Sequence, residues 1–144
     1  MRVIFGALAL LGLLSACDPN PRSGAPAAFD PLTASIADIH RLIDAGELSC
    51  RDVIETYLAR IDALDQRTGL NAIIFTNSAA LARAAEVDAL LAAGEQPGPL
   101  YCAPVLLKDN MDTGDMPTSG GSIALKGSVP PDDAFIVRRL RQAG

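Results

Sequence analysis

The spacing of apolar residues predicts a helix near the start of the patterned part of the chain. Ile36, Ile39 and Ile43 recur at intervals of three and four residues, which places them on one face of a helix over about 34–45. Gly46 follows directly and is suited to end this helix, because glycine adopts the left-handed conformation of a helix C-cap without strain.

A second helix is predicted to open at Ser49. Its hydroxyl can cap the helix, and Asp52, three residues later, completes the pattern of a capping box. The apolar residues that follow recur at helical spacing and are Val53, Ile54, Tyr57, Leu58, Ile61 and Leu64. A short turn containing glycine separates the two helices, so we expect them to pack as antiparallel neighbours.

Two apolar runs predict strands. The run over 72–75 is short and β-like, whereas the run over 100–109 reads LYCAPVLLKD and is almost continuously apolar. Such a run fits a strand that is buried on both faces, as in a parallel sheet covered by helices. Lys108 lies at the C-terminal end of this predicted strand, where ligand sites gather in α/β folds.

An alanine-rich helix is predicted between these two runs. It is expected to start at Asn77 or Ser78, to reach about Ala93 and to end at Gly94. The remaining predicted segments are a loop over 110–121, a short helical stretch over 122–125 and a final helix over about 133–142. Strands alternating with helices indicate the α/β class.

The N-terminal residues have the layout of a secretory signal. Arg2 gives a positive start, an apolar run covers 3–14, and the small residues Ser15 and Ala16 follow. The run is too short to span a bilayer as a membrane helix. We therefore interpret residues 1–16 as a signal peptide.

The four residues Leu-Ser-Ala-Cys that end at Cys17 resemble the bacterial lipobox. The resemblance implies cleavage before Cys17 and lipidation of its sulfur, and several acyl chains hold a protein stably at a membrane. A proline-rich tether over 17–31 would join this lipid anchor to a domain over 32–144. We expect an exported lipoprotein facing the periplasm or the cell exterior, with Asp18 favouring retention at the inner membrane.

Composition narrows the possible partners. The 144-residue chain has a net charge of −5 and no basic cluster, which argues against nucleic acid, since phosphate binding needs a Lys/Arg surface. Tryptophan is absent and aromatic residues make up 4% of the chain, so a platform for stacking bases is not expected. His40 is the one histidine, and its place in a helical pattern indicates an ordinary helix residue rather than a catalytic one.

Two cysteines follow Cys17. Export to an oxidising compartment would permit a bridge between Cys50 and Cys102. Because Cys50 opens a predicted helix and Cys102 falls in a predicted strand, nothing in the pattern indicates that the two meet. We expect free thiols.

An ordered set of motifs fills the C-terminal part of the chain. From Pro104 to Leu125 it reads PVLLKDNMDTGDMPTSGGSIAL, and it continues with SVPPDDAFIVRRLRQAG. This set resembles the N-terminal portion of the amidase signature family, and the resemblance extends over nearly all residues from Leu32 onward. It implies an α/β/α sandwich around a mixed sheet, of which only the N-terminal part is present here.

The resemblance also implies a chemistry. Members of the family hydrolyse carboxamides with a Ser-cisSer-Lys arrangement, whose lysine maps onto Lys108 and takes a proton from the nucleophilic serine through a bridging serine. Such a base must be neutral at the working pH, and burial in an apolar setting favours the neutral form. Asp109 and Asn110 are expected to orient the lysine segment. The alternative is that Lys108 is an ordinary surface lysine paired with Asp109 or Asp112.

Both family serines lie in a Gly/Ser-rich segment well downstream of the lysine. The residues after Lys108 form no such segment, so we expect the nucleophile and the bridging serine to lie beyond this chain and the chain alone to be inactive. Ser119 and Ser122 are flanked by glycines and could be taken for substitutes. Ser122 also stands at a predicted helix start, so capping is its expected role.

The predicted activity of the complete protein is hydrolysis of linear carboxamides to a carboxylate and ammonia or an amine. The substrate would be a small-molecule or peptide amide, and neither a metal nor an organic cofactor is expected. One alternative is a transamidating protein, similar to the amidase-type subunit of an amidotransferase. The other is a non-catalytic lipoprotein that keeps only the front of the fold. Tyr101-Cys102-Ala103 stands where a His-Gly-Ile type run is common in the family, which leaves substrate preference open.

Overall fold

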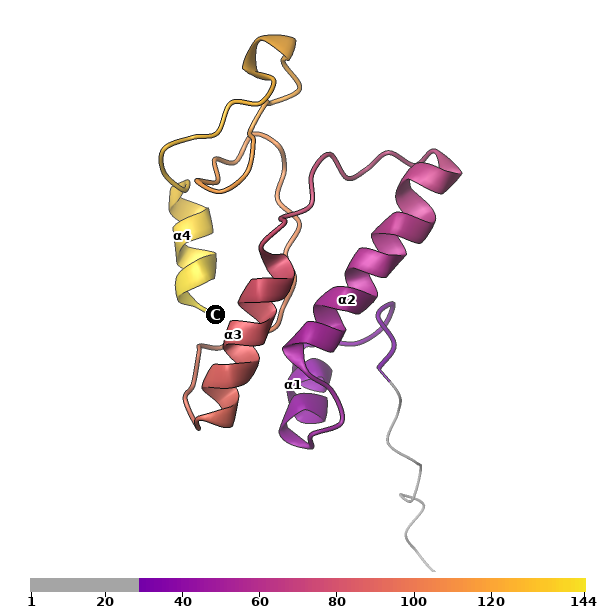
Figure 1. The fold of residues 1–144 in the computed structure, drawn as a ribbon, viewed down its shortest axis with the longest axis vertical. Helices are drawn as coiled ribbons and strands as arrows, with labels where there is room; N and C mark the ends of the chain where they lie inside the picture. The colour runs from indigo at the N-terminus through magenta and orange to yellow at the C-terminus, as the bar shows by residue number, and fades with distance from the viewer. Residues whose placement is uncertain (1–28) are drawn as a thin grey trace, which may run out of the picture.

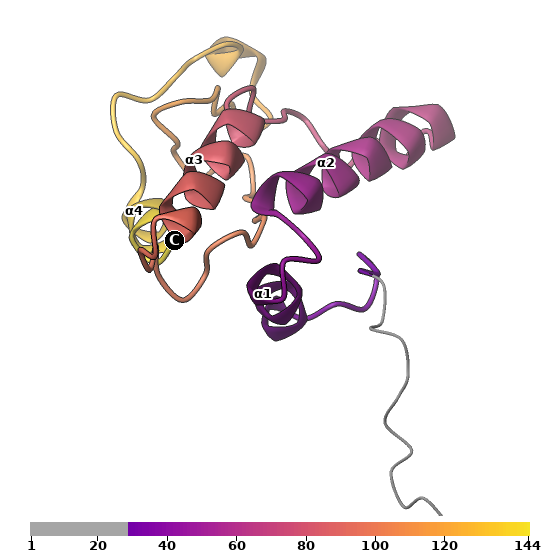
Figure 2. The same ribbon diagram turned by 60° about the horizontal axis from the view of Figure 1, so that its bottom comes forward.

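The computed structural model describes residues 29–144, which form a helical structure. Its helices are α1 (Ile36–Asp44), α2 (Cys50–Ile61), α3 (Ala80–Ala92) and α4 (Phe135–Gln142). A π-helical turn, η1 (Asp62–Gln66), extends α2, and a short 3-10 turn, η2 (Ile123–Leu125), lies in the long connection from α3 to α4. Figures 1 and 2 show α2 and α3 side by side, with α1 near the N-terminal end of α2 and α4 beside α3.

The N-terminus of α2 is fixed by the predicted capping box. The Ser49 hydroxyl accepts a hydrogen bond from the Asp52 amide at 3.0 Å, and the Asp52 carboxylate accepts one from the Ser49 amide at 2.9 Å. These bonds satisfy two donors that a helix start otherwise leaves free. Ser35 and Asp38 form the same box at the start of α1, where the sequence pattern had not led us to expect one.

The C-terminus of α1 confirms the expected role of Gly46. This residue has φ +70°, and its amide donates to the Ile43 carbonyl at 2.9 Å. The Glu47 amide donates to the Leu42 carbonyl, also at 2.9 Å. The two bonds form a Schellman motif, which turns the chain toward α2.

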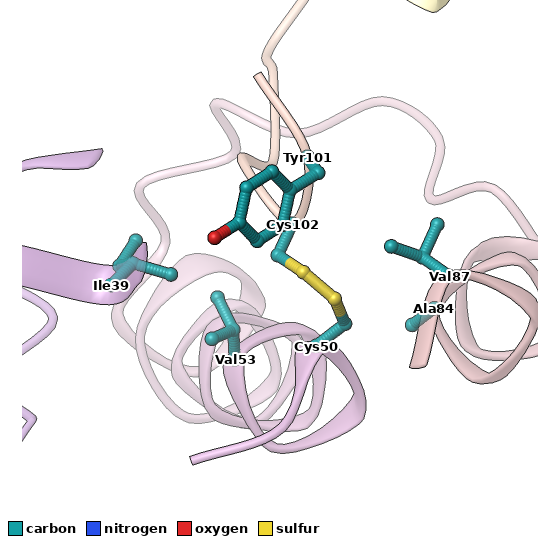
Figure 3. Packing of buried hydrophobic residues seen from close by; sticks show 7 residues of the cluster. All are labelled: Ile39, Cys50, Val53, Ala84, Val87, Tyr101 and Cys102. Carbon is teal, nitrogen blue, oxygen red and sulfur yellow. A yellow bond between two sulfur atoms is a disulfide. The ribbon is translucent and has the colours of Figure 1, made fainter. Parts of the chain in front are cut away.

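The hydrophobic core lies where α1, α2 and α3 meet the turn over 99–102 (Figure 3). Its buried members are Ile39, Cys50, Val53, Ala84, Val87, Tyr101 and Cys102. Val53 and Cys50 are fully buried. Alanine on α3 leaves little side chain between the helices, so α3 can pack closely against α2.

Neither predicted strand forms within residues 29–144. The run over 72–75 is an irregular connection that bends at Ile74, and Ile74 and Phe75 are exposed. The run over 100–109 begins in a turn, because Cys102 has a left-handed φ of +58° that a strand does not accommodate. The remainder, 103–108, is extended and has no neighbouring strand among the described residues, so the expected ladder of hydrogen bonds is missing there.

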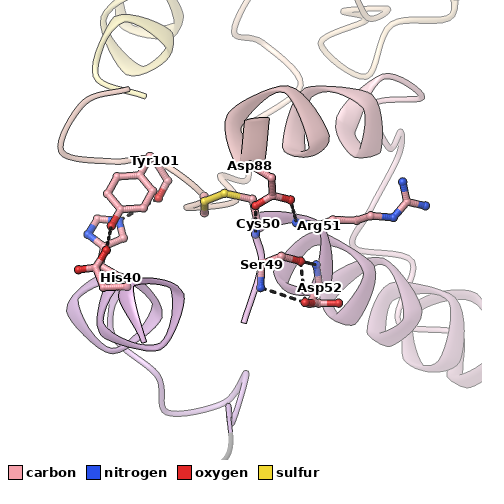
Figure 4. Close-up of a disulfide and its surroundings, with 9 residues drawn as sticks. His40, Ser49, Cys50, Arg51, Asp52, Asp88 and Tyr101 are labelled. Carbon is pink, nitrogen blue, oxygen red and sulfur yellow. Dashed lines mark hydrogen bonds between the residues drawn. A yellow bond between two sulfur atoms is a disulfide. The ribbon is translucent and has the colours of Figure 1, made fainter. Parts of the chain in front are cut away.

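The prediction of free thiols is wrong, because Cys50 and Cys102 form a disulfide (Figure 4). Their Cα atoms lie 4.9 Å apart, within the usual range for a bridge. The prediction failed because it placed Cys102 in a strand. The turn at this position instead brings its side chain to the N-terminal residue of α2.

The predicted signal peptide, the lipidation site Cys17 and most of the tether lie outside the described residues. Phe29 is the first described residue, and its ring packs edge-on against Tyr57 with centroids 6.2 Å apart. The Tyr57 hydroxyl donates to the Pro31 carbonyl at 3.2 Å. Over residues 29–144, no helix combines the length and apolar character needed to cross a membrane.

Candidate active site

Lys108 ends the extended segment over 103–108 and is exposed. Its carbonyl accepts a hydrogen bond from the Met111 amide at 2.9 Å, so the chain turns immediately after it. Its ammonium forms no ion pair with any carboxylate among residues 29–144, including those of Asp109 and Asp112. The burial expected for a lysine base is not provided by these residues either.

Asp109 closes the loop that follows the lysine. The Ser119 hydroxyl donates to the Asp109 carboxylate at 2.5 Å, and the Ser119 amide donates to its other oxygen at 3.0 Å. The Gly121 amide adds a third bond at 3.3 Å, and the Gly120 amide donates to the Asp109 carbonyl at 2.8 Å. Hydrogen bonding from the Ser119 hydroxyl is the main cause that lowers the pKa of Asp109, with the backbone amides adding to it.

The other two predicted roles in this loop find less support. Asn110 is exposed, and its side chain forms no hydrogen bond with a described residue, so Asp109 is the member of the pair that has partners. Ser122 occupies the N-cap position of η2, but its side chain makes no capping hydrogen bond. The capping role predicted for Ser122 is therefore wrong, because a three-residue 3-10 turn has few free amides to cap.

Ser119 has a structural role that its flanking glycines did not indicate. Its hydroxyl donates to Asp109 and accepts a hydrogen bond from the Gly121 amide at 3.2 Å. The hydroxyl proton is thus directed at a carboxylate ten residues away in sequence. No local pattern of spacing could have identified this bond, since the intervening loop has no regular period.

Acidic side chains also hold the lysine loop to the chain just before α3 and to α4. Asp115 accepts a hydrogen bond from the Asn77 side chain at 2.8 Å and pairs with Arg141 of α4 at 2.7 Å. Arg141 also pairs with Asp133 at 2.9 Å, and Asp133 accepts a bond from the Gly114 amide at 2.9 Å. Burial opposes ionisation of Asp115, but the bonds from Arg141 and Asn77 outweigh it and lower the pKa of this carboxyl.

Three contacts hold the 99–102 turn, which precedes the lysine segment. The Tyr101 ring stacks on His40 of α1 with centroids 3.7 Å apart, and His40 Nε2 lies 2.9 Å from the Tyr101 carbonyl (Figure 4). The disulfide ties Cys102 to α2, and the Leu100 amide donates to the Ala143 carbonyl at 2.8 Å. His40 lies in α1, as predicted, and packs on this turn. Burial is the main cause that raises the pKa of Tyr101, with the nearby Asp44 carboxylate adding to it.

Two further features lie away from the lysine. A groove of about 480 Å³ borders the end of α3 and carries the acidic residues Asp44, Asp88 and Glu95. Asp88 is already engaged, because its carboxylate accepts the amides of Cys50 and Arg51 at 2.7 and 3.1 Å. In the part of the chain that the structure describes, no cluster of three or more His, Cys, Asp or Glu residues could hold a metal ion.

Comparison of the chain with known proteins identifies a family. Residues 52–144 match the family model described as Amidase. A glutamyl-tRNA(Gln) amidotransferase subunit from Salinispora arenicola is 44% identical over 115 residues, covering 80% of this chain and 23% of that protein.

Solved structures give the same result. The native peptide amidase from Stenotrophomonas maltophilia is 46% identical, with a TM-score of 0.71, over 77% of this chain and 23% of that one. An amidase family protein from Bacillus anthracis is 34% identical, with a TM-score of 0.73, over 78% and 23%. The chain thus spans about a quarter of the length of the relatives it matches. Because the family model covers more than half of the chain and includes Lys108 and its loop, the chain belongs to the amidase family.

Proposed function

We propose that the whole protein hydrolyses linear carboxamides to a carboxylate and ammonia or an amine, with Lys108 as its base. The observation that carries this proposal is how Lys108 and the chain on both sides of it are held in the structure. Its ammonium has no carboxylate partner among residues 29–144, while the chain on both sides of it is tied down by the disulfide at Cys102 and the Asp109–Ser119 bonds. The segment is thus fixed at both ends, and no carboxylate within the described residues occupies the Lys108 side chain.

The chemistry divides between this chain and the rest of the protein. Neutral Lys108 accepts a proton, relayed by a bridging serine, from a nucleophilic serine that attacks the amide carbonyl. The leaving amine departs with a proton, and water then hydrolyses the acyl-enzyme to release the carboxylate. In this proposal both serines come from a Gly/Ser-rich segment of the kind that the family resemblance implies, which these 144 residues do not contain.

Peptide and small-molecule amides are the substrates we favour. A solved neighbour is named a peptide amidase and is 46% identical to this chain. A transamidating role is the second candidate, since a 44% identical relative is named as part of a glutamyl-tRNA(Gln) amidotransferase. The charges favour hydrolysis of peptide and small-molecule amides over a transamidating role on tRNA. The chain is acidic overall, and Arg141, on the arginine-rich α4, is neutralised by Asp115 and Asp133.

The cellular setting is part of the same proposal. The N-terminal pattern supports cleavage before Cys17, lipidation of that cysteine and display of the enzyme on the outer side of a membrane. Mass spectrometry of the mature N-terminus tests it: acyl mass on Cys17 is expected, and an unmodified Cys17 or a retained Met1 would contradict it.

The chain offers a matched control for testing the base. It contains two lysines, Lys108 and Lys126, and both are exposed in the structure. Ammonia release from a panel of peptide amides and simple carboxamides should fall by several orders of magnitude in Lys108→Ala of the whole protein, as the loss of an essential base does. Lys126→Ala should remain close to the unaltered enzyme. Full activity in Lys108→Ala would remove this residue from the mechanism, and turnover by the 144-residue chain alone would refute the division between base and nucleophile.

A further inference from the structure

The disulfide between Cys50 and Cys102 lies inside the hydrophobic core. Cys50 is fully buried and Cys102 is 8% exposed. Figure 3 shows the bond between α2 and the 99–102 turn, with Val53 on one side and Ala84 and Val87 on the other. Sulfur atoms in such a setting are shielded from other thiols, so the bond is protected from exchange once the core has formed.

The backbone at Cys102 is arranged to make this bond. Its φ of +58° is uncommon for a residue other than glycine and has to be held by its surroundings. The holding contacts come from the neighbouring residues, with Tyr101 stacked on His40 and the Leu100 amide bonded to Ala143. These contacts turn the Cys102 side chain toward α2, although the two cysteines are 52 residues apart in sequence.

We propose that Cys50–Cys102 is a structural disulfide made in an oxidising compartment, and that it mounts the segment carrying Lys108 on α2. The two thiols lose two protons and two electrons to the disulfide of a thiol–disulfide oxidant, which becomes a dithiol as the Cys50–Cys102 bond forms. Lys108 follows six residues after Cys102. The extended segment between them has no strand partner among the described residues, so its position depends on its two ends.

Burial distinguishes this disulfide from a reversible switch and bears on where the protein matures. A regulatory disulfide has to be reached by a reductant, whereas this one is enclosed by the core. Thiols of cytosolic proteins are kept reduced, and structural disulfides are made in secreted or periplasmic proteins. The buried disulfide therefore supports the same oxidising compartment as the N-terminal signal pattern. The two arguments are independent, because Cys50 and Cys102 lie outside that pattern.

The first test measures the thiols themselves in the full-length protein, expressed with its own N-terminus in a bacterium that has a periplasm. The protein is denatured, alkylated without reductant and mapped by mass spectrometry. We expect one linked peptide pair that holds Cys50 and Cys102, with both cysteines alkylated only after reduction. The single variant Cys50→Ala should leave Cys102 open to alkylation, which shows that the reagent reaches it. Alkylation of both cysteines in the unreduced protein would overturn the proposal.

The second test measures the mounting of the lysine segment. A protease that cleaves after lysine is added to the oxidised protein and to protein whose disulfide has been reduced in denaturant before refolding, with loss of the bond verified by alkylation. Cleavage at Lys108 is then compared with cleavage at Lys126. Reduction should speed cleavage at Lys108 by roughly tenfold or more. Local unfolding of the segment that carries Lys108 becomes easier once the disulfide no longer ties Cys102 to α2. The rate at Lys126 should change much less, and the variant Cys50→Ala/Cys102→Ala should not respond to reductant. Equal acceleration at both lysines, or none at Lys108, would overturn the mounting role. Neither test uses amide hydrolysis, so the proposed activity and the mounting role can fail separately.

Discussion

Two regions of the chain are held in different ways. Residues 29–102 bury apolar side chains among α1, α2 and α3 and close a long loop with a disulfide. The lysine region over 103–134 leaves most of its large apolar residues exposed, with Leu106 at 77% and Ile123 at 84%. That region is tied together by carboxylates that accept backbone amides, as Asp109 and Asp133 do.

The difference shows what each region contributes. Apolar burial and a disulfide that closes a loop of this length, worth about 4 kcal/mol by chain entropy, favour one rigid arrangement. Hydrogen bonds that these partly exposed carboxylates accept contribute less to stability, but they are directional and fix the path of a loop. The helical region is therefore the platform, and the lysine region is shaped on it by polar contacts.

The largest expected effect on stability comes from the core. Val53→Ala removes two fully buried methyl groups and should lower the free energy of unfolding by about 2 kcal/mol, from lost burial and the cavity left behind. Leu106→Ala in the same 144-residue chain removes a larger but exposed side chain and should change it by less than about 0.5 kcal/mol. Urea unfolding followed by circular dichroism measures both. Similar shifts for the two variants would mean that the platform and the loop are not distinct.

A second effect concerns the polar contact between α2 and α3. Asp88 accepts the amides of Cys50 and Arg51, so its charge lies against the positive end of α2. Asp88→Ala should cost about 2 kcal/mol, since bonds to a charged group are the stronger kind. Glu86 is the matched control, because it is more exposed and its one ion pair among residues 29–144 is with Arg83 on the same helix. Glu86→Ala should be near neutral in the same unfolding experiment, and an equal cost would show that the helix-end geometry contributes nothing.

The sequence revealed those features that depend on near neighbours. The capping box at Ser49 and the glycine that ends α1 involve residues within a few positions of each other, so their patterns are readable without the fold. A strand exists only through a hydrogen-bonded partner, and none lies beside 103–108 among the described residues, so the sheet expected there stays a prediction. The disulfide was missed because it depends on one backbone angle at Cys102. Lys108 was found through a resemblance, because its place at the end of an apolar run does not by itself distinguish a catalytic lysine from an ordinary surface lysine.

The Asp109–Ser119 contact can be tested by titration. The pKa of Asp109 is lowered mainly by the Ser119 hydroxyl, so folding favours the ionised carboxylate. The stability that this bond contributes is present above the unfolded pKa, near about 3.9, and is lost as the pH falls through the lower folded value. Ser119→Ala should therefore raise the pKa of Asp109 toward its usual value, as measured by NMR of the carboxyl group. Exchange of the Gly121 amide should also become faster. Ser119→Thr keeps the hydroxyl and should preserve the low pKa, and an unchanged titration in Ser119→Ala would show that this hydroxyl does not hold the loop.

The smallest expected effects compare two serines at N-cap positions, one in each region. Ser49 has a capping bond to the Asp52 amide, whereas Ser122 at η2 has none. Ser49→Ala should lower the free energy of unfolding by about 1 kcal/mol, because a helix-start amide loses its acceptor. Ser122→Ala should leave it unchanged within about 0.3 kcal/mol, since no bond is removed. Ser49→Asp restores an acceptor at the helix start and should recover most of the loss, which separates capping from a general effect of substitution. A cost at Ser122 equal to that at Ser49 would mean that η2 is capped in solution and that the lysine region is more ordered than its exposed side chains indicate.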